Sequence, residues 1–207
     1  MNVKTVISGH EVTPRQGEVL EAALNVLVSS GSKMTMSAVA SEAKCSKETL
    51  YNWFGDRSGL LVATVQWQAS KVREPILDLT QLDFVSLEKS LKGFAFDLLN
   101  VLSSDISVAL NRIAIASINK DDELGRVVLE NGRLAMGRRL KPILEAAQNK
   151  FLLQFNDSEE AFKTFFGLVV KDVQIRLLLG ENLYLTPSQT NLAALSATKQ
   201  FLTLYKT

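Results

Sequence analysis

The sequence predicts an all-α protein with an N-terminal helix-turn-helix domain and a C-terminal helical domain. Three observations indicate this fold class. Apolar residues recur at helical spacing through most of the 207 residues, and no segment of useful length alternates as a β-strand does. Glycines, prolines and short polar segments separate the helical runs. Two of those runs, within residues 35–61, are too short to form a core unaided and flank a three-residue turn.

The first predicted helix begins at Pro14 and ends at Gly31. Thr13 precedes it as the capping residue, Pro14 takes the first helical position and Gln16 the third, which together form a capping box. Glycine is a typical residue just past a helix C-terminus, so Gly31 marks the end. The apolar face of this helix consists of Leu20, Ala23, Leu24 and Leu27.

Residues 35–61, TMSAVASEAKCSKETLYNWFGDRSGLL, carry the most informative pattern. A helix over residues 37–43 is followed by the turn Lys44-Cys45-Ser46 and then by a short polar helix over residues 47–54. A second helix that is short, polar and held by the one before it is typical of the helix that reads the DNA major groove. The residues expected in the small core of this domain are Val39, Ala40, Ala43, Leu50 and Phe54.

Six further helical segments are predicted after this one. The first, over residues 57–73, is ended by Glu74-Pro75, because proline cannot continue a helix. The segment that Asp105 opens is apolar nearly all round and is expected to be buried. The next long segment is expected to kink or break at Pro142. Gly180 ends the penultimate one. The segments after the proline are 86–102, 105–118, 122–150, 158–179 and 187–205.

The final segment has apolar side chains on two of its sides. One stripe consists of Leu192, Leu195 and Leu202, and the other of Ala194, Ala197, Phe201 and Leu204. One such side packs against the helix's own domain, and a partner subunit is the simplest cover for the other. We therefore expect a homodimer formed through the last two helices.

Composition narrows the remaining possibilities. The chain is 46% hydrophobic and 22% charged, as in ordinary globular proteins, and no stretch approaches the length of a membrane span. The N-terminal residues have no apolar signal core, so we expect a cytoplasmic protein without a membrane partner. One cysteine and one histidine, far apart in sequence, leave no metal cluster, and we expect no cofactor. We expect Cys45 to fill the turn as a small apolar residue rather than to act as a redox sensor.

Net charge gives little support for nucleic-acid binding. The chain has a net charge of +1, and its first 74 residues contain eight basic and seven acidic side chains. DNA affinity would therefore have to come from locally placed cations, and two copies in a dimer would double the phosphate contacts. The basic residues clustered around the turn and the ends of the short helix are Lys33, Lys44, Lys47 and Arg57.

The run from Thr35 to Leu61 resembles the signature of the TetR/AcrR family of bacterial one-component regulators. The matching residues are Thr35, Val39, Ala40, Ala43, Ser46, Thr49, Leu50, Tyr51, Trp53, Phe54 and Leu60. The sequence departs at Lys44, Cys45 and Arg57, where the family usually has Gly, Val and Lys. Lys44 places a side chain where the turn often needs a positive φ, at a cost of about 1 kcal/mol. The late segment RLLLGE resembles the AefR-like branch of the family.

The resemblance implies a helix-turn-helix DNA-binding domain over residues 1–58 and an effector-binding and dimerisation domain over residues 59–207. It implies a sequence-specific transcriptional regulator, most simply a repressor, that a small, largely apolar effector releases from a pseudo-palindromic operator. There are two alternatives. One is a DNA-binding protein of the same fold that a protein partner controls, and the other is a helical small-molecule carrier or enzyme. An enzyme is disfavoured because the sequence lacks a Ser/His/Asp or Cys/His set and a phosphate-binding loop. The sequence does not identify the effector, the operator or the regulated genes.

The chemistry of the short helix suits contacts with double-stranded DNA. Ser46 is placed to cap it, and a helix N-terminus favours phosphate. Lys47 suits guanine or a phosphate, Glu48 suits cytosine and Asn52 suits adenine. The resemblance adds residues that hold the DNA backbone, although Tyr51 and Trp53 would alternatively pack on neighbouring helices. The predicted DNA-binding residues are Thr35, Ser37, Lys44, Ser46, Lys47, Glu48, Thr49, Tyr51, Asn52, Trp53 and Arg57.

The resemblance also implies a ligand cavity in the C-terminal domain. Apolar side chains would line it and a few polar groups would orient the ligand. For each apolar residue the alternative is an ordinary place in the core. Arg112, in an otherwise apolar helix, is either paired within the core or an anchor for an anionic ligand. The predicted ligand-binding residues are Trp67, Phe94, Leu98, Leu110, Asn111, Ile113, Ser117, Met136, Phe165 and Phe166.

Overall fold

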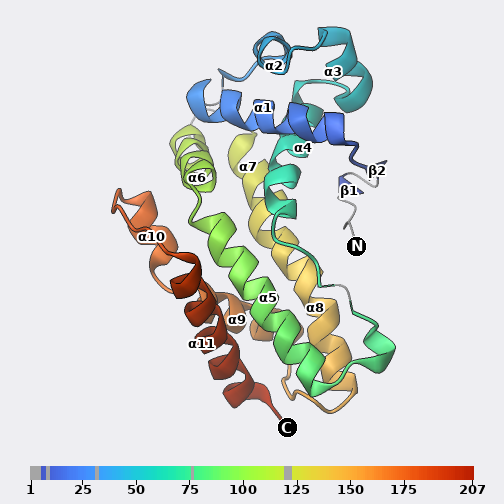
Figure 1. Cartoon of the computed structure of the whole chain (residues 1–207), viewed down its shortest axis with the longest axis vertical. Helices are drawn as coiled ribbons and strands as arrows, with labels where there is room; N and C mark the ends of the chain where they lie inside the picture. The colour runs from blue at the N-terminus through green and yellow to red at the C-terminus, as the bar shows by residue number, and fades with distance from the viewer. Residues whose placement is uncertain (1–5, 8–9, 31–32, 76, 119–122) are drawn as a thin grey trace. The chain divides into compact units, whose positions relative to one another are not determined.

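The computed structural model describes residues 6–7, 10–30, 33–75, 77–118 and 123–207 (Figure 1). The regular structure of the described residues is helical, apart from one short antiparallel ladder, in which β1 (Val6–Ile7) pairs with β2 (His10–Glu11), and an isolated bridge between Leu153 and Lys206. This confirms the predicted all-α class. The α-helices are α1 (Pro14–Ser30), α2 (Met36–Glu42), α3 (Lys47–Phe54), α4 (Arg57–Ser70), α5 (Phe84–Leu102), α6 (Asp105–Ser117), α7 (Leu124–Val128), α8 (Leu134–Asn149), α9 (Ser158–Val170), α10 (Val173–Leu178) and α11 (Pro187–Tyr205).

The packing divides the chain into two compact units. The first contains residues 1–71 and 105–133, and the second contains residues 72–104 and 134–207. Helices α4, α6 and α7 therefore belong to the same compact unit as the helix-turn-helix helices α1 to α3. The predicted boundary at residue 58 separates DNA-binding from effector-binding residues by their roles, and not by packing. It stays a prediction.

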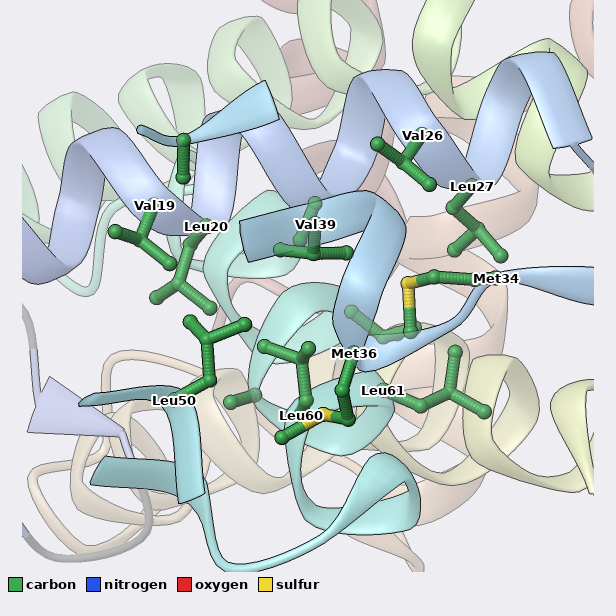
Figure 2. Packing of buried hydrophobic residues seen from close by; sticks show 14 of the residues in the cluster. Val19, Leu20, Val26, Leu27, Met34, Met36, Val39, Leu50, Leu60 and Leu61 are labelled. Atoms are coloured by element: carbon green, nitrogen blue, oxygen red, sulfur yellow. The ribbon is translucent and has the colours of Figure 1, made fainter. Parts of the chain in front are cut away.

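The core of the first unit forms where α1 to α4 meet (Figure 2). Leu20 and Leu27 of α1, Val39 of α2, Leu50 of α3 and Leu60 of α4 are completely buried. The small three-helix core expected from the sequence is thus present, and α4 extends it. Further buried members of this cluster come from α6 and α7: Leu110, Ala114, Leu124 and Val127.

Side-chain caps fix the ends of the helices in the first unit. The predicted capping box at α1 is present: the Thr13 backbone N–H donates to Gln16 Oε1 at 2.9 Å, and the Gln16 N–H donates to the Thr13 hydroxyl at 3.2 Å. Asp56 caps α4 by accepting from the Gly59 N–H at 2.8 Å. α4 ends at Ser70. The sequence-based end at residue 73 is therefore three residues too late.

Aromatic side chains from three helices fill the core of the second unit. The Phe165 ring of α9 lies 6.5 Å from that of Phe94 on α5 and 5.1 Å from that of Phe201 on α11. All three side chains are buried. Asp83 caps α5 in a capping box with Ser86, so this helix begins at Phe84, two residues before the predicted start.

Two segments differ from the helices that periodicity predicts. The segment 122–150 contains a π-helical turn, η4 (Leu129–Arg133), between α7 and α8. A kink or break was expected at Pro142, but no break occurs there: α8 continues through this residue, and the neighbouring Leu140 and Ile143 are buried. The segment 158–179 is interrupted at Lys171, which has a φ of 45°.

The expectation that α6 is buried on all sides is wrong for the residues described in this unit. Ile115 is 57% exposed, and Ile118, just beyond the helix, is 64% exposed. Leu110 and Ala114 are buried against the core, so only one face of this apolar segment is buried. No single helix in the described ranges is long and apolar enough to cross a bilayer; α5 and α6 meet that test only when taken together.

Candidate nucleic-acid interface

α3 is held to the first unit by one buried side chain and by its N-terminal cap. Leu50 is completely buried and Phe54 is half-buried against the same core. The Ser46 hydroxyl accepts a hydrogen bond from the Thr49 N–H at 3.0 Å, as the sequence predicted, and lies 2.9 Å from the Thr49 hydroxyl. Gly55, with a φ of 78°, ends the helix. These contacts fix the direction of a helix of only eight residues.

The remaining side chains of α3 face solvent. Lys47, Glu48 and Asn52 are exposed, and Thr49 is half-buried beside its cap. Tyr51 is 52% exposed and therefore is not a core residue. Such a row of charged, amide and aromatic groups can supply both hydrogen-bond donors and acceptors to base edges and phosphates.

Trp53 combines packing with exposure. Its ring meets that of Phe54 edge-on with centroids 6.2 Å apart, yet 37% of its surface is exposed. The two interpretations of this residue, packing and contact with the DNA backbone, are thus compatible in this geometry.

The residues predicted at the start of α2 lie at an exposed helix N-terminus. Thr35 caps α2 by accepting from the Ala38 N–H at 3.1 Å, and Ser37 is exposed in the first turn. Hydroxyl groups at a helix N-terminus, next to free backbone N–H groups, are suited to a phosphate. Their contact with DNA stays a prediction.

Lys44 has the left-handed backbone that its place in the turn requires. Its φ is 50° and its side chain is exposed. Cys45, the next residue, is half-buried against the core, which agrees with its expected place as a small apolar filler. The turn thus accommodates lysine at a position where the TetR/AcrR signature usually has glycine.

Arg57, which the resemblance assigns to a DNA phosphate, already contacts protein groups in this structure. Its Nε donates to the Met34 carbonyl at 2.9 Å, and its Nη1 lies 3.2 Å from Glu123 Oε1. The Ser58 hydroxyl donates to the same carboxylate oxygen at 2.8 Å. Arg57 therefore connects the loop before α2 to the start of α7, and Glu123 is a partner that the sequence analysis did not include.

The predicted ligand-binding residues are divided between the two compact units. Leu110, Asn111, Ile113 and Ser117 lie on α6 and Trp67 on α4, in the first unit. Ser117 is buried and donates to the Ala114 carbonyl, and Asn111 donates to the Ser107 carbonyl, so both bond within their own helix. The candidates in the second unit are Phe94, Leu98, Met136, Phe165 and Phe166. Their joint role in one ligand site stays a prediction.

Trp67 has well-defined contacts with α1. Its ring lies over Gly17, where an added Cβ would come within 2.9 Å of the ring, and its Nε1 donates to Glu21 at 2.7 Å. Lys71 also pairs with Glu21, at 2.8 Å. The sequence signals that could have shown this contact are Gly17 on an otherwise apolar face and Glu21 one turn later.

Arg15 is the residue near the reading helix that the sequence analysis missed. It lies in the first turn of α1, yet its Nη2 donates to the Ala43 carbonyl at 2.7 Å and to the Lys44 carbonyl at 3.3 Å. No short-range pattern indicates this contact, because the partners are 28 and 29 residues apart. No three His, Cys, Asp or Glu side chains of the described residues are placed to hold a metal ion.

Comparison with known proteins agrees with this architecture. The family described as AefR-like transcriptional repressor, C-terminal domain, matches residues 89–207. A TetR transcriptional regulator from Agrobacterium tumefaciens is 43% identical, with 94% of this chain and 96% of that chain covered and a TM-score of 0.75. No curated protein matches the chain.

Two further solved structures are similar over most of their length. The flavonoid-responsive regulator FrrA is 26% identical, covering 93% of this chain and 97% of its own, with a TM-score of 0.66. A TetR-family regulator from Mesorhizobium loti shares the fold at 24% identity and a TM-score of 0.73, covering 93% and 97%. With its helix-turn-helix unit and AefR-like C-terminal domain, the chain belongs to the TetR family of DNA-binding transcriptional regulators, which are not enzymes.

Proposed function

We propose that this regulator is a cytoplasmic homodimeric repressor, whose two α3 helices enter successive major grooves of a pseudo-palindromic operator. The observation that supports this most is the exposed polar side of α3. Leu50 anchors the helix, while Lys47, Glu48 and Asn52 remain free of the core. A rigidly mounted helix with such a face is what base readout requires.

Each exposed group has a proposed partner on the DNA. Lys47 is assigned to guanine O6/N7 or a phosphate, Asn52 to adenine and Glu48 to the cytosine amino group. Arg57 would exchange Glu123 for a phosphate when the operator binds. The residues assigned to the DNA backbone are Thr35, Ser37, Lys44, Ser46, Thr49, Tyr51, Trp53 and Arg57.

The operator can be obtained by selecting bound fragments from genomic DNA. On the recovered duplex, Lys47→Ala and Tyr51→Ala should each weaken binding at least about fivefold at fixed salt, as expected from loss of a base or phosphate contact of about 1 kcal/mol. Lys89→Ala, an exposed lysine on α5 in the second unit, is the matched control and should bind normally. Unchanged affinity of both α3 variants would overturn the site assignment.

Dimerisation is assigned to the last helices of the second unit. Leu179, just after α10, is 81% exposed and Tyr184 before α11 is 78% exposed, and Leu192 and Leu204 of α11 are also exposed. The stripes expected on the final helix are corrected at two positions: Leu202, grouped with Leu192, is buried, and Leu204, grouped with Phe201, is exposed. Large apolar side chains in such number favour a protein interface over solvent. Leu179→Glu combined with Leu192→Glu should convert a dimer into monomers in sedimentation at micromolar concentration, whereas a wild-type monomer would refute the proposal.

The effector is proposed to be a small, largely apolar molecule. The similar regulator FrrA is described as flavonoid-responsive, which supports an aromatic ligand class. An effector releases the operator only if it binds the DNA-free conformation more tightly. A flavonoid panel, with straight-chain fatty acids as the comparison, should raise the melting temperature and release the selected duplex. Release by none of them, together with release by a co-purifying protein, would instead favour control by a protein partner.

A further inference from the structure

The turn between α2 and α3 contains an unfavourable residue in a well-formed cap. The Cys45 N–H donates to the Ala40 carbonyl at 3.0 Å, and the Lys44 N–H donates to the Ser41 carbonyl at 3.3 Å. This is the Schellman arrangement, in which the residue with positive φ is usually glycine. Lys44 occupies that position with a φ of 50°. Lysine is disfavoured there, so the turn needs stabilisation from elsewhere.

Arg15 supplies a contact at this point. Its Nη2 donates to the carbonyls of Ala43 and Lys44, which follow the last turn of α2. Carbonyls at a helix C-terminus lack partners within the helix and carry partial negative charge, so a guanidinium both satisfies them and interacts favourably with the helix dipole. In Figure 1, α2 lies beside α1.

We propose that Arg15 is a positioning residue for DNA reading, which holds Lys44 in its left-handed conformation and thereby sets the direction of α3. Only Cys45 separates Lys44 from Ser46, the cap of α3. A change of the Lys44 backbone therefore rotates the whole reading helix. This inference rests on the proposed reading of DNA by α3.

Arg15 does not act as a phosphate ligand in this arrangement. Its Nη1 pairs with Glu18 at 2.6 Å, while its Nη2 is engaged with the two carbonyls. Loss of Arg15 should therefore lower DNA affinity without changing how steeply affinity falls with salt, since that slope counts neutralised phosphates. A direct phosphate contact would instead reduce the slope by about 0.9 per contact.

The test compares Arg15→Ala with Glu18→Ala, which removes the other partner of the guanidinium. The probe is the duplex recovered by the fragment selection, titrated over a range of salt concentrations. Arg15→Ala should bind about tenfold more weakly with an unchanged salt slope, as expected for loss of a charge-assisted hydrogen bond. Glu18→Ala should bind normally. A reduced salt slope, or wild-type affinity in Arg15→Ala, would overturn the proposal.

A double-mutant cycle with Lys44→Gly separates positioning from general stabilisation. Glycine accepts the positive φ unaided, so Arg15→Ala should cost about twofold or less in the Lys44→Gly background. The cycle cancels any DNA contact that Lys44 itself makes. An equal loss in both backgrounds would refute the proposed role.

One further measurement and one substitute variant complete the test. Hydrogen exchange at the Cys45 amide should accelerate in Arg15→Ala, while the amides of the buried part of α1 stay protected.

If Arg15→Ala does not fold, Arg15→Lys replaces it, because lysine keeps the charge but lacks the planar fork. If Lys47→Ala and Tyr51→Ala bind normally, the proposed function fails; if they weaken binding and the Arg15 variants do not, only this inference fails.

Discussion

α3 and α11 each bury one side and expose another, but different forces hold them in place. α3 has eight residues and buries only Leu50 completely, so its position depends on the Ser46 cap and on the turns at its ends. α11 has 19 residues, and Ala194, Ala197 and Phe201 are completely buried along it. A reading helix must keep its surface free for DNA, and therefore relies on a few local bonds rather than on buried area. The inner side of α11 needs no free surface, so buried area can hold that helix in place.

The largest expected effect is on the aromatic core of the second unit. Phe165→Ala should destabilise the protein by about 3–5 kcal/mol, because it leaves a cavity between Phe94 and Phe201. Urea unfolding followed by far-UV circular dichroism would measure the change. Tryptophan fluorescence reports the first unit separately, because Trp53 and Trp67 are the only tryptophans in the sequence and both lie there.

Phe151→Ala is the matched control, since this phenylalanine is 83% exposed. It should change stability by no more than about 0.5 kcal/mol. If both variants shift the unfolding curve equally, the aromatic cluster does not stabilise the second unit as the comparison requires.

Leu50→Ala should have the next largest effect, on the unit that reads DNA. Removal of this completely buried side chain should destabilise the first unit by about 2–4 kcal/mol. Because the exposed side of α11 that is proposed to form the dimer is untouched, the oligomeric state should not change. Fluorescence-detected unfolding and sedimentation would test the two statements. Loss of the dimer in this variant would contradict the assignment of dimerisation to the second unit.

A comparison of two caps tests the contrast between α3 and α11 directly. Ser46→Ala and Thr186→Ala each remove an N-cap, at about 1 kcal/mol. Hydrogen exchange should accelerate throughout α3 in the first variant, because a helix this short has little else to hold it. In the second, only the first turn of α11 should exchange faster. If exchange accelerates to the same extent along both helices, α3 does not depend on its cap more than α11 does.

The smallest expected effect concerns the cap of α5. Hydrogen bonds from the Ser86 hydroxyl, and then from its backbone N–H, hold the pKa of Asp83 below its usual range. The ionised cap therefore stabilises the fold above the unfolded pKa of about 4, and this contribution is lost as pH falls through the lower folded pKa. The melting temperature of the wild type should exceed that of Asp83→Ala near neutral pH, and the difference should shrink in acid. A pH-independent difference would show that the charge has no role.

The elements near the reading helix could be predicted well because their signals are local. The caps Thr13 and Ser46 follow from a few adjacent residues, and the structure contains both. The positive φ of Lys44 was indicated by the resemblance to the TetR/AcrR signature, which usually has glycine there. In the C-terminal half of the chain, local sequence patterns did not correctly indicate where the helices are interrupted. No glycine or proline lies between residues 168 and 179, so the interruption at Lys171 is not visible in the periodicity. Pro142 indicated a kink or break, but the helix continues through it and its neighbours Leu140, Ile143 and Leu144 are buried.

The sequence by itself determined the all-α class, the helix-turn-helix segment and the exposed polar side of α3, because spacing, capping residues and turn residues act over a few positions. Tertiary structure alone decided the contacts of Arg15 with the turn and of Arg57 with Glu123. Each of these joins residues at least 28 positions apart. Such pairs form only when the buried faces of the helices bring them together, and no local pattern records that.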